Sequence, residues 1–548
     1  MKVPCRANRV VLRDVRKRRH VPCYGEIAEI PGSVSHESRG GQVLVRQMTH
    51  VVKLAGRRSP LAPILRALLK RSAPLARELK LGRTDNWPRA AQWLLSAPGT
   101  PSLRDPRLLD ALRYDINRDI DTELLLTEVR KALLLGRSRD LWNDPTGHPF
   151  LCALLQQCIN NEYVWFVSDE EQSRIQHLSG PAVAPPLTSP DAWPTLLVLA
   201  LYRPLHELLG LATASAPLTL RALGWLPDPF RLLVQDYVES HQEEMTIKHS
   251  IERFGAISDD VSRTVAAMYE VFPYPRWVRL AEPAPGARQK WLTAFLGQAP
   301  LFLNRPFDVL VPGCGTGRKA IQIALGFGEQ ARVLATDLSR ASLAYAARMA
   351  RKYRLRNIQF LQMDILDLPK FAQQFDVVEC TGVLVCVADP LKTWKVLVDH
   401  TRPSGLVHVS LYSELARREI VRLRKDYEHQ IATIDTDFIR AYRRRLMLEQ
   451  PATVDALPTR GDFFDLSRCK DLLFHPVEHR FTIPQIRRYI AALGLEFRGF
   501  EPPKPLASRY WTPFPRPAHQ RDLDRWWQFE QKYPDAFQDL YEIWCRKS

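Results

Sequence analysis

The stretch that decides the fold is FDVLVPGCGTG, at residues 307–317. It begins with an apolar run typical of a buried strand, and glycines follow at positions 313, 315 and 317. Glycine lets the backbone turn sharply from a strand into a helix and leaves no side chain to block a ligand packed against the turn. The spacing differs from the dinucleotide pattern Gly-x-Gly-x-x-Gly, and the Gly-Lys-Ser/Thr ending of a P-loop is missing. Alone, such a turn is also found as a purely structural corner.

Strand and helix patterns alternate on both sides of this turn. The expected strands are 307–311, 332–336, 358–363, 375–380 and 406–411, and the expected helices between them are 319–327, 341–353 and 391–400. Near-continuous apolar strands separated by helices predict a doubly wound, Rossmann-like α/β fold with a parallel sheet. In such a fold the chemistry lies at the carboxyl ends of the strands.

Acidic residues stand at three of these strand ends. Asp337 ends the second strand, where a carboxylate can accept hydrogen bonds from two ribose hydroxyls. The third strand ends in Met363-Asp364-Ile365, which offers a carboxylate for an adenine amino group and apolar faces for its ring. Glu379 ends the fourth strand, beside the place of a transferred group. Taken singly, Asp337 or Asp364 also suits a helix cap or a turn, but their succession favours a nucleoside site.

These residues resemble the class I S-adenosylmethionine-dependent methyltransferases, whose fold is a seven-stranded sheet. The resemblance implies that S-adenosylmethionine is the cofactor and that the three glycines line its methionine and ribose part. It further implies a ribose site at Asp337 and Leu338, an adenine site at Met363, Asp364 and Ile365, and a cofactor contact at Glu379.

Further segments, from about residue 100 to the C-terminus, resemble one bacterial subfamily of these enzymes. Its members join the methyltransferase domain to an N-terminal helical region often described as tetratricopeptide repeats. Matching stretches include 337–346, 382–384 with 388–390, and 411–418. The subfamily commonly has two histidines where this chain has Val385 and Cys386, a departure that concerns the substrate pocket and the activity.

Composition and pattern predict five segments. They are a basic segment at 1–60, disordered or a misassigned start; a helical domain at 61–265; the first five strands of the methyltransferase core at 266–413; a helical, basic cap insertion at 414–478; and the C-terminal completion of the sheet at 479–548, with strands at 495–500 and 540–545. The net charge is +17, and the first segment holds 13 Lys and Arg against 4 Asp and Glu. The arginines of the insertion indicate either a solvated helix face or a surface for an anionic substrate or an acidic protein.

Attack on a sulfonium methyl group is a direct displacement, which needs alignment and exclusion of water more than an obligatory general base. The candidate catalytic residues, all expected near the methyl group, are Tyr274, Arg276, Glu379 and Tyr412. The Tyr-Pro-Arg-Trp run at 274–277 suits a rigid turn packed on the sheet equally well.

The helical region favours a protein acceptor that docks on it, by analogy at the level of the fold. Two alternatives stay open: a cofactor-binding scaffold without turnover, and a methyltransferase for RNA or a small metabolite. An Asn/Asp-Pro-Pro-Tyr/Phe motif is missing after the fourth strand, which disfavours amino-group methylation of adenine, although nucleic acid is not excluded. We expect no metal site, no membrane span and a cytoplasmic location.

Overall fold

The structure is a computed structural model of the 548-residue chain. It describes residues 61–69, 86–136, 141–142, 144–180, 192–210, 224, 226–457, 460–502, 509–512, 514 and 519–548. The basic segment at 1–60 lies outside these residues, so the expectation for it is not addressed.

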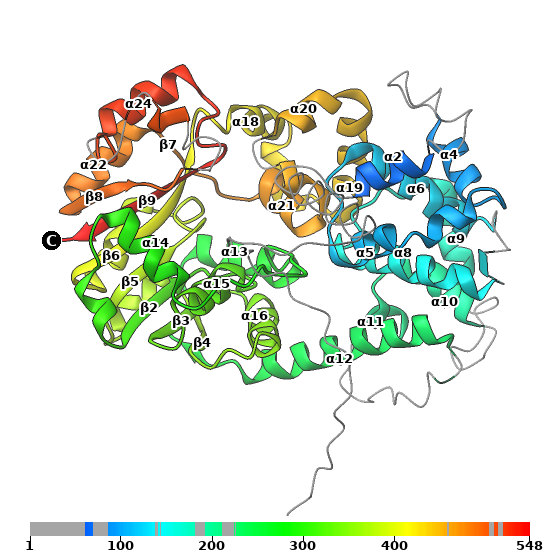
Figure 1. Cartoon of the computed structure of the whole chain (residues 1–548), viewed down its shortest axis with the longest axis horizontal. Helices are drawn as coiled ribbons and strands as arrows, with labels where there is room; N and C mark the ends of the chain where they lie inside the picture. Colours follow the sequence, from blue (N-terminus) through cyan, green and yellow to red (C-terminus); the bar gives the residue numbers. More distant parts are fainter. Residues whose placement is uncertain are drawn as a thin grey trace, which may run out of the picture. The chain divides into compact units, whose positions relative to one another are not determined.

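The described residues contain one sheet of nine strands (Figure 1). The strands are β1 (Arg253–Phe254), β2 (Phe307–Pro312), β3 (Ala331–Asp337), β4 (Ile358–Met363), β5 (Phe375–Cys380), β6 (Thr401–Ser413), β7 (Arg480–Phe481), β8 (Leu495–Phe500) and β9 (Leu540–Lys547). Their order is β1-β4-β3-β2-β5-β6-β9-β8, with β7 beside β6. Only β9 runs antiparallel to its neighbours. The expected doubly wound α/β fold is confirmed, and the seven expected strands form its body.

Alternate residues of the strands face two helical layers. Val309 and Val311 belong to an apolar cluster with the helices α14 (Ala287–Leu296), α15 (Arg318–Phe327) and α16 (Arg340–Lys352). Leu310 belongs to the opposite cluster, with α17 (Pro390–Asp399), α22 (Ile483–Ala492) and α24 (Leu523–Lys532). A strand buried on both faces must be apolar at every position, which explains the near-continuous apolar runs.

The described part of the chain before the sheet is helical. Its helices are α2 (Leu61–Leu69), α4 (Trp87–Leu94), α5 (Pro106–Tyr114), α6 (Ile120–Leu134), α8 (His148–Asn160), α9 (Asp169–Ser179), α10 (Trp193–Ala200), α11 (Leu205–Leu208) and α12 (Asp228–Ser250). Polar caps fix several of their starts; the Ser168 side chain, for example, forms a capping box with Glu171. The helical region is as expected, whereas a tetratricopeptide-repeat arrangement remains a prediction.

The insertion shares its core with these N-terminal helices. It holds α18 (Arg418–Lys425), α19 (Thr436–Glu449), α20 (Pro451–Ala456) and α21 (Leu466–Phe474). Buried residues of the insertion such as Ile420, Ile439 and Leu446 belong to the same apolar cluster as Leu125 and Leu154. The side chain of Arg443 donates two hydrogen bonds of 2.8 Å to the carboxylate of Glu123. The insertion and the helical region therefore pack as one body, although residues 266–413 separate them in the sequence.

Helix α12 joins this body to the sheet. It packs on α8 of the helical region and on α16 beside the sheet. Glu244 accepts a hydrogen bond from Arg348 at 2.6 Å, and Glu243 accepts one from Arg351 at 3.0 Å. The sheet itself begins at β1, before residue 266, because the two residues of β1 pair with β4.

Candidate active site

A cavity of about 460 Å³ lies at the carboxyl edge of the sheet. The ends of five strands contribute to its lining: Gly313 and Gly315 after β2, Asp337 and Leu338 from β3, Met363 to Leu366 from β4, Thr381 to Val383 after β5, and Tyr412 of β6. A cavity of this size at the carboxyl ends of parallel strands suits a nucleotide-sized ligand.

The glycine turn has no room for side chains at its first two glycines. Gly313 and Gly315 have φ angles of 63° and 53°. A Cβ atom on Gly313 would lie 2.2 Å from Val383 Cγ2, and one on Gly315 would lie 2.2 Å from the backbone oxygen of Tyr274. Both glycines line the cavity. Their lack of a side chain lets the backbone approach a ligand closely.

The structure places Gly317 elsewhere. It begins α15 with a φ of 80°, and a Cβ atom there would lie 2.5 Å from the Cβ of Ala346 in α16. Gly317 is not among the residues that line the cavity. The structure gives Gly317 a packing role, because the third glycine lets two helices meet, and the expected cofactor contact there stays a prediction.

Asp337 lies at the centre of the cavity wall with 8% of its surface exposed. Its carboxylate accepts hydrogen bonds from the backbone N–H groups of Gly315 at 2.8 Å and of Ser339 at 2.9 Å. Burial raises the pKa of Asp337 to about 6, so the carboxylate is mainly ionised at neutral pH. An ionised carboxylate in this position can accept hydrogen bonds from ligand hydroxyls.

The residues expected around an adenine ring come together on one side of the cavity. Met363, Asp364 and Ile365 all line it. The carboxylate of Asp364 also accepts the backbone N–H of Leu366 at 3.0 Å and so caps the short helix η6 (Ile365–Lys370). Asp364 therefore caps this helix and lines the cavity at the same time. Two residues of α13 (Asp260–Val271), Ser262 and Val265, complete this side and were not foreseen.

Glu379 does not reach the cavity. It is fully buried, and Arg288 of α14 donates three hydrogen bonds of 2.6–3.0 Å to its carboxylate. His408 lies 3.3 Å from the same carboxylate on its other side. Arg288 and His408 hold the pKa of Glu379 well below its usual range despite burial. The oxygens of Glu379 are thus taken up by an internal ion pair, and the structure does not bring this residue together with the others expected at the site.

Arg276 also lies away from the residues that line the cavity. Its guanidinium lies 5.2 Å from the ring centroid of Tyr345, and the residue does not line the cavity. The neighbouring turn packs on the glycine loop, because Thr316 donates its N–H to Tyr274 and Trp277 donates its indole N–H to Thr316. Of the run 274–277, Tyr274 and Pro275 both line the cavity, and the backbone oxygen of each accepts a hydrogen bond from Thr316.

A second part of the cavity is lined by tyrosines and acids. The tyrosines are Tyr269, Tyr274 and Tyr412, and the rings of Tyr269 and Tyr274 have centroids 6.0 Å apart. The insertion supplies Asp462, Asp471 and Leu472. The sequence gives no motif around these acids, so their place follows only from the packing of α21 against the sheet.

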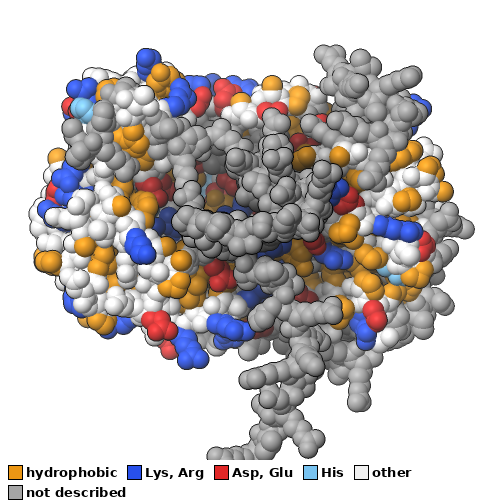
Figure 2. Space-filling view, in the orientation of Figure 1, with side chains coloured by type: hydrophobic (Ala, Val, Ile, Leu, Met, Phe, Trp, Pro, Cys, Tyr) orange, Lys and Arg blue, Asp and Glu red, His pale blue; other side chains and the backbone are white. Residues whose placement is uncertain are grey.

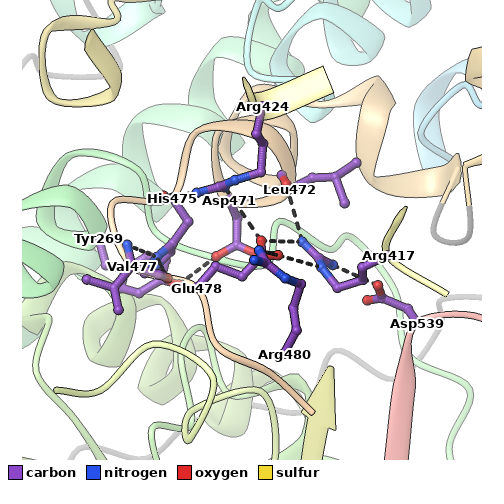
Figure 3. A network of polar contacts seen from close by, with 10 residues as sticks. All are labelled: Tyr269, Arg417, Arg424, Asp471, Leu472, His475, Val477, Glu478, Arg480 and Asp539. Carbon is purple, nitrogen blue, oxygen red and sulfur yellow. Dashed lines mark hydrogen bonds and ion pairs between the residues drawn. The ribbon is translucent and has the colours of Figure 1, made fainter. Parts of the chain in front are cut away.

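A network of buried ion pairs borders this part of the cavity (Figure 3). Arg417 donates hydrogen bonds of 2.7 Å to Glu478 and to Asp539. Its guanidinium also lies 3.6 Å from the ring centroid of Tyr412. Arg417 lowers the pKa of Glu478, so this carboxylate stays ionised. The network fixes Tyr412 and joins the start of the insertion to the segments before β7 and β9.

The basic insertion is less exposed than its sequence indicates. Arg417 and Arg443 are fully buried and ion-paired, and Arg424 is 8% exposed. The face in Figure 2 shows basic, acidic and hydrophobic side chains interspersed over the described residues. Part of the charge expected to face a substrate is thus neutralised inside the protein. In the ranges that the structure describes, no helix combines the length and apolar character needed to cross a membrane.

Comparison with known proteins agrees with this geometry. Residues 305–449 match a family model described as a methyltransferase domain. An uncharacterized protein from Synechococcus, syc1184_c, is 29% identical over 264 residues, which are 45% of this chain and 62% of that protein. The chain therefore matches less than two thirds of that relative's length.

Solved structures with partial similarity include methyltransferases. PKMT2 from Rickettsia typhi in complex with AdoHcy is 16% identical, with 50% of this chain and 54% of that chain covered and a TM-score of 0.34. Magnesium protoporphyrin IX methyltransferase from Synechocystis with bound SAH is 12% identical, with 58% and 100% covered and a TM-score of 0.27. Both TM-scores lie below 0.5, so neither structure carries a functional conclusion.

The strand order, the cavity at the carboxyl edge and the family match agree on one assignment. Residues 305–449 match a methyltransferase domain, in agreement with the resemblance of the residues at the strand ends.

Proposed function

We propose that the protein transfers a methyl group from S-adenosylmethionine to a protein acceptor. One observation carries the choice of acceptor: the insertion lines the cavity and shares its core with the N-terminal helices. A protein bound to those helices would be held by the same body that forms one wall of the cavity. The helices therefore provide a docking surface that is mechanically tied to the reaction site.

The residues at the strand ends provide the cofactor site in this proposal. Gly313 and Gly315 allow close approach of the methionine part, and Asp337 with Leu338 holds the ribose. Met363, Asp364 and Ile365 lie beside the adenine. The bound cofactor supplies an electrophilic methyl group. The dimensions and donors of the cavity suit it, because the buried carboxylate of Asp337 faces a space of about 460 Å³.

The tyrosine part of the cavity receives the acceptor. Tyr274 and Tyr412 are the two expected catalytic residues that line it, and their rings exclude water and orient the incoming atom. Such alignment speeds a direct displacement, because a nucleophile already held in line with the methyl group does not need to meet it by diffusion. We assign both tyrosines to positioning of the acceptor.

Labelling of a cell lysate with tritiated methyl groups tests this function. The purified full-length protein, S-[methyl-³H]adenosylmethionine and heat-treated lysate should give label that survives nuclease and is lost after protease. A matched reaction without the protein gives the background. Label lost to nuclease would instead establish RNA as the acceptor, and label in the small-molecule fraction a metabolite.

The scaffold alternative has a specific observation in its favour. Val385 and Cys386, the residues that depart from the subfamily, line a small recess that adjoins Tyr269 and Tyr412. The thiol of Cys386 donates to the backbone oxygen of Val383 at 3.1 Å, and burial raises its pKa far above the usual range, so it is not a nucleophile. Calorimetric binding of S-adenosylmethionine without turnover on any lysate fraction would favour the scaffold.

A further inference from the structure

One carboxylate of the insertion faces the reaction cavity without a basic partner. Asp471 belongs to α21, is 8% exposed and lines the tyrosine part of the cavity. Its carboxylate accepts one hydrogen bond, of 2.6 Å, from the hydroxyl of Tyr269 in α13. Across the described residues, no Lys, Arg or His forms an ion pair with Asp471. A buried carboxylate in this state suits a cationic ligand.

Asp471 differs in this respect from the acids of the neighbouring network (Figure 3). Glu478 and Asp539 each accept a hydrogen bond of 2.7 Å from Arg417, which already neutralises them. The guanidinium of Arg417 is turned toward those two acids and toward the ring of Tyr412. Arg417, which lines the cavity together with Asp471, is therefore engaged by other acids and leaves the carboxylate of Asp471 available to a ligand.

The wall around Asp471 is aromatic. The rings of Tyr269, Tyr274 and Tyr412 line the same part of the cavity. Aromatic faces attract cations, and their rings exclude water from around a charged ligand. The titratable groups that face Asp471 from the packed elements are Tyr269, Tyr274, Cys386, Tyr412, Arg417, His475, Glu478 and Asp539.

We propose that Asp471 binds the ammonium group of a lysine side chain on the acceptor protein and removes its proton, which makes the nitrogen the nucleophile for methyl transfer. This inference rests on the proposed function. It adds the class of acceptor atom and a catalytic residue from the insertion.

The step balances in atoms and charge. The carboxylate of Asp471 takes one proton from the ammonium, which leaves a neutral amine and a carboxylic acid. The nitrogen lone pair forms the new N–C bond, and the C–S bond breaks with its electron pair on sulfur. The products are a methylated ammonium and S-adenosylhomocysteine, and the proton on Asp471 passes to water when they leave. Burial raises the pKa of Asp471 to about 6, so the carboxylate is ready to accept a proton at neutral pH.

The substitution Asp471→Asn tests the inference, because asparagine keeps the shape and hydrogen bond but cannot take the proton. The probe is heat-treated lysate protein, used directly and after acetylation of its amines. Wild-type protein should label the untreated fraction and lose most of that label on the acetylated one. At pH 7 the variant should label at least about 100-fold more slowly, the usual contribution of a positioned base.

The pH dependence separates a proton acceptor from a structural residue. A lysine amine in water has a pKa of about 10.4, so its neutral fraction rises steeply between pH 7 and pH 9.5. The ratio of wild-type to variant rate should therefore fall at least about tenfold over this range. A loss caused by misfolding or by a displaced wall would keep the same ratio at both pH values and would overturn the inference.

Matched controls keep the test decisive. Asp437→Asn changes an exposed carboxylate on α19 of the same insertion and should leave labelling unchanged. Calorimetry must show that Asp471→Asn binds S-adenosylmethionine as wild type does; if it does not, Tyr269→Phe takes its place, with an expected loss of about tenfold at pH 7.

A fully active variant, or label that resists acetylation, refutes the inference alone. A wild-type protein that labels no lysate protein refutes the proposed function, and this inference with it.

Discussion

At the scale of single residues, Asp337 is the residue that we expect to hold the ribose of the cofactor. We expect Asp337→Ala to weaken S-adenosylmethionine binding by about 10- to 100-fold, because hydrogen bonds to a charged group contribute about 1.5–3 kcal/mol. Isothermal titration calorimetry measures this change. Asp399→Ala, an exposed carboxylate at the end of α17, is the matched control. Unchanged affinity in Asp337→Ala would place the ribose elsewhere.

Gly317 allows a test of packing against ligand binding. It has a φ of 80°, and an added Cβ would meet Ala346 at 2.5 Å, whereas Gly297 has a φ of 79° and open space around it. Gly317→Ala should lower the free energy of unfolding by about 2–4 kcal/mol, and Gly297→Ala by only about 1–2 kcal/mol. Urea unfolding monitored by circular dichroism compares them. Equal losses in the free energy of unfolding for the two variants would mean that α15 and α16 can move apart at no cost in free energy.

Sequence reasoning placed some of these residues well and others wrongly, for a physical reason. Gly313, Gly315, Asp337 and Asp364 take their positions from the strand end they occupy, which is a local property. Glu379 also ends a strand, yet Arg288, 91 residues earlier in the chain, takes up its carboxylate. Asp471 shows the opposite case, since only the tertiary packing of α21 brings it to the cavity. Local pattern carries no information on such distant partners.

At the scale of elements, the ion pair between α6 and α19 holds the insertion to the helical region. Glu123 and Arg443 are both almost fully buried. Glu123→Ala leaves the guanidinium buried without its partner, which should cost about 3–5 kcal/mol in the free energy of unfolding. Lys131→Met breaks the partly exposed pair with Glu170 and should cost under about 1 kcal/mol. A small loss in Glu123→Ala, measured by urea unfolding, would contradict the shared core.

Glu530 of α24 lies where this helix packs on β6 and β9. We expect its carboxyl group to make the free energy of unfolding depend on pH. It is fully buried and accepts hydrogen bonds from Ser413 at 2.7 Å and from Tyr541 at 2.7 Å. Burial raises the pKa of Glu530 from its ordinary value of 4.5 to about 7. The neutral acid therefore stabilises the fold below about pH 4.5, and this contribution is lost as the pH rises through 7.

Glu530→Gln should remove that dependence. Relative to wild type, the variant should gain up to about 3 kcal/mol in the free energy of unfolding between pH 4.5 and pH 8, because it never ionises. Urea unfolding at both pH values gives the difference. A constant offset between the two proteins would show that the carboxyl group ionises in the folded state as easily as in the unfolded chain.

The elements themselves were largely predictable. Five strands and three helices of the core have a clear period in the sequence, and the structure places each within a few residues of its expected ends. The two missed strands, β1 and β7, have two residues each, too few for any period. Both add to the sheet through pairing with β4 or β6, which only the folded structure reveals.

At the scale of the whole molecule, the methyltransferase sheet is not independent of the N-terminal helices. A fragment of residues 251–548 should leave the apolar faces of α18, α19 and α21 without their partners. We expect it to bind the dye ANS strongly and to be cut by protease between residues 414 and 478, while the full chain resists. A fragment that unfolds cooperatively with an intact insertion would contradict the shared core.

The Glu123–Arg443 ion pair can form only after the ribosome has made both residues. The two residues are 320 positions apart. At about 5–20 residues per second, the ribosome needs roughly 15–60 s to pass from one to the other. Once residue 250, the end of α12, has been made, the N-terminal helices are complete but lack the insertion that covers part of their apolar surface. The nascent chain therefore offers a chaperone a hydrophobic face that the finished protein buries.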